Sequence, residues 1–163
     1  MTHWERLSSQ AEKIIKACSA ANVMVATAES CTGGLIAGVL TEISGSSAVV
    51  DRGFVTYSNE AKMEMIGVSS ETLTLYGAVS AQTAMEMADG ALERSNADIA
   101  VAVTGIAGPG GGSAEKPVGT VHLAIAKRNH PTQHQLAHFG DVSRDTVRLK
   151  TVEAALILIS NAI

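Results

Sequence analysis

The sequence contains little that would hold a fold together covalently or place it in a membrane. Its two cysteines, Cys18 and Cys31, form neither a CxxC pair nor a disulfide framework. Residues 1–20 lack the charged and then apolar pattern of a secretory leader, and no apolar run is long enough to span a bilayer. We therefore expect a cytoplasmic protein with reduced thiols and no membrane partner.

An excess of basic residues is also missing. The chain contains 12 lysines and arginines and 16 acidic residues, which gives a formal net charge of -4. This balance argues against nucleic acid as a partner, although an acidic protein can still carry a local basic pocket for a phosphate. The length of 163 residues and the 46% hydrophobic content predict one globular domain, residues 1–163, that needs no disulfide or structural metal.

Several common cofactor and metal motifs are absent. No G-x-G-x-x-G follows a predicted strand, and Tyr57 and Lys62 are one residue too far apart for the Tyr-xxx-Lys pair of short-chain dehydrogenases. The glycine-rich segment 104–120 does not match the Walker pattern, and His134 and His138 belong to no H-E-x-x-H arrangement. We expect neither a cofactor nor a metal, and we interpret the histidines as core or surface residues.

The periodicity of the apolar residues predicts a mixed α/β chain. Helical spacing marks both ends, and short apolar runs between turn residues indicate strands, the last two of which form a hairpin around Asn129 and Pro131. The predicted helices cover residues 7–18, 33–40, 59–65, 80–94 and 142–163, and the predicted strands cover 23–26, 47–56, 99–103, 118–126 and 133–139. This order favours helices that flank one mixed sheet.

A turn of small polar residues, TAESCTGG at 27–34, lies where a strand gives way to a helix. Such a turn can present backbone N–H groups and hydroxyls to an anion or a developing oxyanion. Helix capping by Ser30 and Thr32 is the simpler explanation of this segment taken alone. Ser30 and Cys31 are rival nucleophiles, and their spacing does not decide between them.

Two further segments contain polar residues next to predicted strand ends. Lys62, in GFVTYSNEAK at 53–62, is a candidate base because a desolvated lysine can lose its proton near neutrality. A solvated lysine on a helix surface is the usual alternative. The loop at 105–119 has six glycines and two prolines, which favours a functional role. Arg144 and Arg148, at i and i+4, share a helix face that either reaches a phosphate or is solvated.

Five segments in order resemble the CinA C-terminal family, the nicotinamide-nucleotide amidases. They are TAESCTGG at 27–34, GFVTYSNEAK at 53–62, GAVS at 77–80, TGIAGP at 104–109 and KPVGT at 116–120. The resemblance implies a three-layer α/β/α fold with a mixed central sheet. It also implies hydrolysis of nicotinamide mononucleotide to nicotinic acid mononucleotide and ammonia, in pyridine nucleotide recycling and without a metal. Gly110 stands where many members carry aspartate.

The resemblance further implies roles for individual residues. Ser30 would be the nucleophile, Lys62 the general base and Tyr57 an assisting residue. Backbone donors in the turn at 32–34 would stabilise the oxyanion, and the loop at 105–119, with an arginine, would hold the ribose phosphate. The residues expected to bind substrate are Thr32, Gly33, Gly34, Ser47, Asn59, Thr104, Gly105 and Arg144.

Two alternatives and an expectation about assembly accompany this interpretation. The chain could be a non-catalytic nucleotide-binding accessory protein of the competence and DNA-damage type, in which Ser30 is dispensable. It could instead be an amidohydrolase that uses Cys31, which thiol alkylation would inactivate. Apolar residues on the terminal helices predict a homodimer or a higher homo-oligomer.

Overall fold

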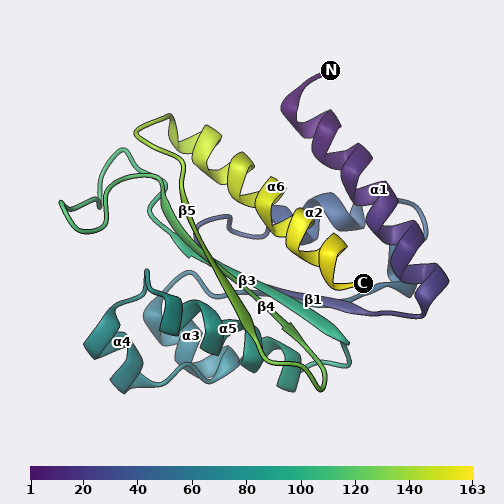
Figure 1. The fold of residues 1–163 in the computed structure, drawn as a ribbon, viewed down its shortest axis with the longest axis horizontal. Coiled ribbons are helices and arrows are strands. Elements are labelled where there is room, and N and C mark those ends of the chain that lie inside the picture. Colours follow the sequence, from purple (N-terminus) through teal and green to yellow (C-terminus); the bar gives the residue numbers. More distant parts are fainter.

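A five-stranded mixed sheet forms the centre of the structure, a computed structural model that describes residues 1–163 (Figure 1). Its strands follow the order β2-β1-β3-β4-β5. β1 pairs in parallel with β2 and β3, whereas β4 is antiparallel to β3 and β5, as the predicted hairpin requires. The strands are β1 (Val25–Glu29), β2 (Val50–Val55), β3 (Ile99–Gly105), β4 (Thr120–Lys127) and β5 (Gln133–His138).

Helices cover both faces of this sheet, which confirms the predicted three-layer α/β/α architecture (Figure 1). One face carries α1 (His3–Ala21), α2 (Leu35–Thr41) and α6 (Arg144–Ala162). The other face carries α3 (Asn59–Ile66), α4 (Ser70–Tyr76) and α5 (Ala81–Glu93). None of the helices combines the length and apolarity that a membrane crossing requires.

Local sequence signals explain where the long helices begin. The Thr2 hydroxyl accepts a hydrogen bond from the Glu5 N–H while the Glu5 carboxylate accepts one from the Thr2 N–H, a capping box that starts α1. Ser80, the first residue of the helix predicted over 80–94, accepts from the Thr83 N–H at the start of α5, and Ser143 accepts from the Thr146 N–H at the start of α6. The helices predicted at both ends of the chain and over 80–94 are therefore confirmed.

Three details differ from the sequence-based expectations. Residues 47–49 are not part of a strand, because Ser46–Ala48 form a 3-10 helix before β2. β1 continues beyond Ala26 as far as Glu29, since its polar residues are buried rather than exposed. Helix α4 was not predicted, because it has no buried residue and hence no apolar stripe to reveal it.

The connections between the parallel strands create a crevice at their carboxyl ends. The chain leaves β1 toward α2 on one face, and it leaves β2 toward α3 on the opposite face. Ligands of open α/β sheets bind where the connections from adjacent strands leave toward opposite faces in this way. The ends of β1, β2 and β3 are therefore the expected place for a site.

Candidate active site

Ser30 and Lys62 meet at the end of β1. Ser30 follows the strand directly, and its backbone N–H donates to the Val103 carbonyl of β3 over 3.1 Å. Its hydroxyl Oγ lies 3.1 Å from Nζ of Lys62, which comes from α3 on the opposite face. Ser30 is 8% exposed and Lys62 is 1% exposed. The two side chains thus form a buried hydroxyl-amine pair.

The surroundings of Lys62 favour its neutral form. Burial lowers the pKa of its ammonium below the ordinary value of 10.5, and none of the ion pairs in the structure involves it. Nζ also contacts the carbonyl oxygens of Thr56 at 2.9 Å and Tyr57 at 3.4 Å. A neutral amine has two N–H donors for these carbonyls, which leaves its lone pair for the Ser30 hydroxyl. Lys62 is therefore placed to accept the serine proton.

Close packing of α3 brings Lys62 to this position. Ser58 caps α3 through a hydrogen bond from the Ala61 N–H, and Gly67 ends the helix in the left-handed conformation. Gly90 of α5 lies directly against the last residue of α3, where a Cβ atom would stand 1.8 Å from the Ile66 carbonyl oxygen. The missing side chain at 90 thus lets α3 approach α5 closely.

Cys31, the rival nucleophile, is 6% exposed. Burial raises the pKa of its thiol to about 12, so the thiol stays protonated at neutral pH. The thiolate is the reactive form of cysteine. The structure therefore favours Ser30 over Cys31 as the nucleophile.

The turn after Ser30 is occupied by Glu29 rather than available to a ligand. The buried Glu29 carboxylate accepts hydrogen bonds from the Thr32 hydroxyl at 2.6 Å and from the Ile36 and Ala37 N–H groups at 2.8 and 3.0 Å. It satisfies the amino end of α2 in the way that an anion would. Sequence reasoning missed this role, although an acidic residue shortly before a predicted helix is a signal for it.

This arrangement corrects part of the expected site. Thr32, Gly33 and Gly34 do not line the cavity at Ser30. The Gly33 N–H instead donates to the Ser30 carbonyl over 3.0 Å. Arg148 also contacts this turn, donating to the carbonyls of Cys31 and Thr32 at 3.2 Å each. Arg148 therefore holds the turn in place.

A cavity of about 280 Å³ opens beside Ser30 and Lys62 at the carboxyl ends of the three parallel strands. Five of the other expected residues, which come from separate elements, also line it: Tyr57, Asn59, Thr104, Gly105 and Arg144. The buried Thr104 donates from its hydroxyl to the Ala78 carbonyl over 2.7 Å. The cavity thus collects chain segments that lie far apart in the sequence.

Tyr57 and Arg144 form the rim of the cavity. The Tyr57 side chain is 60% exposed, and its hydroxyl accepts a hydrogen bond from Arg144 Nη2 over 3.1 Å. Tyr57 contacts Lys62 through its backbone carbonyl. Arg144 also donates from Nη1 to the Gly108 carbonyl over 2.8 Å, and no carboxylate pairs with it. A cation without a counter-ion thus stands at the entrance.

Ser47 was expected at the site but lies elsewhere. It belongs to the exposed 3-10 helix that precedes β2, at the amino end of that strand. The cavity lies at the carboxyl ends of the parallel strands. Ser47 therefore does not contact Ser30 or Lys62 within this chain.

No cluster of three or more His, Cys, Asp or Glu side chains is arranged to hold a metal ion. His122 and His134, on neighbouring strands, stack with 5.1 Å between ring centroids and bring Nδ1 and Nε2 within 2.8 Å. Burial lowers the pKa of His122 to about 4 and also lowers that of His134. This pair belongs to the β4–β5 region and does not line the cavity at Ser30.

Comparisons with known proteins agree over almost the whole chain. Residues 7–163 match the sequence model of the CinA C-terminal domain. The chain is 52% identical over 151 residues to nicotinamide-nucleotide amidohydrolase PncC of Escherichia coli K12, covering 92% of this chain and 90% of that protein. It is 48% identical to a putative competence-damage inducible protein of Caldicellulosiruptor bescii, covering 93% of this chain and 36% of that longer protein.

Solved structures show the same fold. The crystal structure of the competence/damage inducible protein CihA from Agrobacterium tumefaciens superposes with a TM-score of 0.94 and 61% identity, covering 96% of this chain and 94% of that one. A CinA superfamily protein from Escherichia coli superposes with a TM-score of 0.91 and 34% identity, covering 96% and 90% of the two chains.

Proposed function

The chain belongs to the CinA C-terminal domain family, and from this premise we propose that it is a nicotinamide-nucleotide amidase that works through Ser30 and Lys62. It hydrolyses the carboxamide of nicotinamide mononucleotide to nicotinic acid mononucleotide and ammonia, a step of pyridine nucleotide recycling. The observation that carries the proposal is the 3.1 Å contact between Ser30 Oγ and a buried Lys62 Nζ that no carboxylate neutralises.

The reaction starts with proton transfer from Ser30 to Lys62. Ser30 Oγ attacks the carboxamide carbon while its proton moves to Lys62 Nζ. Collapse of the tetrahedral intermediate breaks the C–N bond, and the lysine ammonium returns the proton so that ammonia leaves. Water then attacks the acyl-enzyme, with Lys62 again taking a proton, and releases the acid and free Ser30. Each step needs Lys62 to alternate between neutral and charged forms, which the depressed pKa supports.

The oxyanion requires a hydrogen-bond donor close to Ser30. The backbone N–H of Cys31 follows the nucleophile, has no backbone carbonyl as partner, and belongs to a residue that lines the cavity. The amide after the nucleophile serves this purpose in other serine hydrolases. We assign the oxyanion to this N–H in place of the turn at 32–34, because that turn does not line the cavity and its Gly33 N–H donates to the Ser30 carbonyl.

Arg144 supports a phosphorylated substrate. Its guanidinium stands at the rim without a carboxylate, in a chain of net charge -4, and it presents several donors. A phosphate would replace the weak contact with the Tyr57 hydroxyl by a charged one. Tyr57 and Arg144 thus form the end of the site that selects a mononucleotide over free nicotinamide.

The test is release of ammonia and nicotinic acid mononucleotide from nicotinamide mononucleotide, with chelator present. We expect Ser30→Ala and Lys62→Met each to lower kcat by at least about a thousandfold, because the residues act as one unit. Cys31→Ala is the matched control and should keep most of its activity. Binding of the nucleotide without turnover by folded wild type would contradict the amidase and favour an accessory binding protein.

The pH profile tests the state of Lys62. A base acts only when deprotonated, so kcat/KM should rise tenfold per pH unit below the pKa of Lys62 in the free enzyme and level off above it. Because burial lowers that pKa, the midpoint should lie below 10.5. A profile that is flat from pH 6 to 9 in wild type would argue against Lys62 as the base.

We also propose that the chain acts in the cytoplasm as a homodimer or a higher homo-oligomer. Both cysteines are free thiols, the state that a reducing compartment maintains. The exposed Leu136 of the edge strand β5 and the exposed Ile157 of α6 offer apolar surface for a symmetric contact. Light scattering at micromolar concentration tests the assembly, and a monomeric mass would contradict it.

A further inference from the structure

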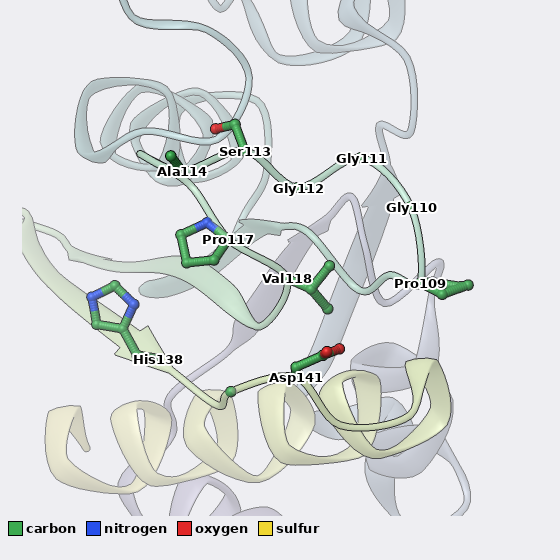
Figure 2. A pocket seen from close by; sticks show the side chains of 11 residues that line it. Pro109, Gly110, Gly111, Gly112, Ser113, Ala114, Pro117, Val118, His138 and Asp141 are labelled. Carbon is green, nitrogen blue, oxygen red and sulfur yellow. The ribbon is translucent and has the colours of Figure 1, made fainter.

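The glycine-rich loop between β3 and β4 separates two cavities. Gly110 and Gly111 line both the active-site cavity and a larger open cavity of about 580 Å³ (Figure 2). Residues 109–112 make no hydrogen bond with the rest of the protein. A backbone segment without such bonds takes its position from the points at which its ends are held.

Each end of this loop is held by a cation, Arg144 of α6 at one end and Lys116 of the loop itself at the other. At one end, the Gly108 carbonyl accepts the hydrogen bond from Arg144 of α6. At the other end, Ser113 and Lys116 form a turn, in which the Ser113 N–H donates to the Lys116 carbonyl over 2.9 Å. The Lys116 N–H donates back to the Ser113 hydroxyl over 3.0 Å. The Lys116 Nζ then reaches out of the loop and donates to the Tyr76 carbonyl over 2.7 Å.

The Tyr76 carbonyl belongs to the segment 76–79, of which Ala78 and Val79 line the active-site cavity. Three consecutive carbonyls of the segment accept hydrogen bonds from side chains of different elements. Lys116 donates to Tyr76, Thr83 of α5 donates to Gly77 at 2.7 Å, and Thr104 of β3 donates to Ala78 at 2.7 Å. The segment is therefore fixed from α5 and β3, and Lys116 attaches the loop to a rigid support.

We propose that Lys116 is a positioning residue that pins the glycine-rich loop to the segment 76–79 and so sets the width of the active-site cavity. Its ammonium pairs with no carboxylate, and its partner is a neutral carbonyl. The contact therefore has a geometric purpose, and it does not neutralise charge. As far as it concerns substrate, the proposal rests on the amidase function proposed above.

Lys116→Met tests this role because it keeps the aliphatic stem and removes the donor. Lys116→Arg is the rescuing variant, and Lys13→Met, on the exposed surface of α1, is the matched control. In Lys116→Met we expect amide hydrogen exchange at Ser113 and Lys116, whose N–H groups are hydrogen-bonded within the turn of the ligand-free chain, to rise about tenfold, as loss of one charge-assisted hydrogen bond implies. KM for nicotinamide mononucleotide should rise about tenfold with kcat within about twofold. Lys116→Arg should restore both values, and Lys13→Met should change neither.

A second substrate distinguishes positioning from direct contact with the phosphate. Nicotinamide riboside lacks the phosphate, so a positioning lysine raises KM for both substrates by the same factor. An effect confined to the mononucleotide, or unchanged exchange at Ser113 and Lys116, would overturn the proposal. The exchange measurement needs no turnover, so it tests Lys116 even if wild type proves inactive and the amidase function fails.

Discussion

The two faces of the sheet are built from residues of different size. Toward α1, α2 and α6 the strands present large side chains, such as Ile99, Val101 and Leu123. Toward α3 and α5 the strands present alanines, such as Ala26, Ala100 and Ala124, and these pack in one cluster with further alanines of α5. Large apolar side chains bury more area and stabilise more, whereas alanines allow a helix to approach closely. The face toward α1, α2 and α6, here called the bulky face, therefore contributes most of the stability. The face toward α3 and α5, here called the alanine face, allows the close helix packing that the Ser30–Lys62 contact requires.

The alanine face is where the chemistry is positioned. Lys62 lies one turn before the end of α3, and that end rests on Gly90 of α5. The distance that the Lys62 side chain spans between α3 and Ser30 is fixed, because Lys62 is buried and its Nζ already contacts the Ser30 hydroxyl. A small displacement of α3 therefore affects the catalytic pair before it affects the rest of the fold.

Gly90→Ala should produce the largest effect. The new Cβ would meet the Ile66 carbonyl oxygen at 1.8 Å, so α3 or α5 must shift. We expect a loss of about 3 kcal/mol or more in the free energy of unfolding and a fall in turnover of at least about a hundredfold per folded molecule. Urea unfolding and active-site titration measure the two separately. Full activity in the folded fraction would show that the close approach of α3 does not set the Ser30–Lys62 geometry.

Ile14→Ala on the bulky face should change stability alone. Ile14 of α1 is 2% exposed in the large apolar cluster and does not line the active-site cavity. Removing three carbons from a packed core costs about 2–5 kcal/mol. We expect thermal unfolding at a lower temperature, with kcat and KM of the folded enzyme within about twofold of wild type. A fall in turnover comparable with that of Gly90→Ala would remove the functional distinction between the faces.

Gly38→Ala should have the smallest effect on the free energy of unfolding, and this effect should be a gain in stability. Gly38 lies on the exposed side of α2, on the bulky face, and a Cβ there would meet nothing within 4 Å. Alanine in a helix interior is about 0.5–1 kcal/mol more favourable than glycine. Denaturant titration should therefore show a small gain in stability with unchanged turnover. Destabilisation would mean that the surroundings of α2 are tighter than the structure shows.

Part of the site could be predicted from motif positions, and part could not. Ser30, Lys62, Thr104, Gly105 and Arg144 lie around one cavity, as the resemblance implied. The turn at 32–34 was expected to bind the oxyanion, but it does not line the cavity, and the Glu29 carboxylate accepts from the Thr32 hydroxyl and from the amides of Ile36 and Ala37 beyond the turn. A carboxylate that turns inward to cap a helix has the same sequence signature as one exposed to solvent, so the pattern alone could not decide.

The helices and strands can likewise be divided into those that the sequence predicted and those that it did not. Helices with an apolar stripe and strands with apolar runs were predicted close to their true positions. Helix α4, which buries no residue, carried no periodic signal and was missed. Ser47 was placed at the site by resemblance, whereas the direction of β2 puts it at the far end of the sheet.

By itself, the sequence determined the α/β architecture, the absence of a disulfide framework and the set of candidate groups, Ser30, Cys31 and Lys62. These depend on local periodicity and on residue type, both of which are readable along the chain. Only the tertiary structure decided that Ser30 and Lys62, 32 residues apart, touch, that the amine is buried without a counter-ion, and that the Cys31 thiol stays protonated. Proximity and desolvation are set by packing between distant segments, and no local pattern encodes them.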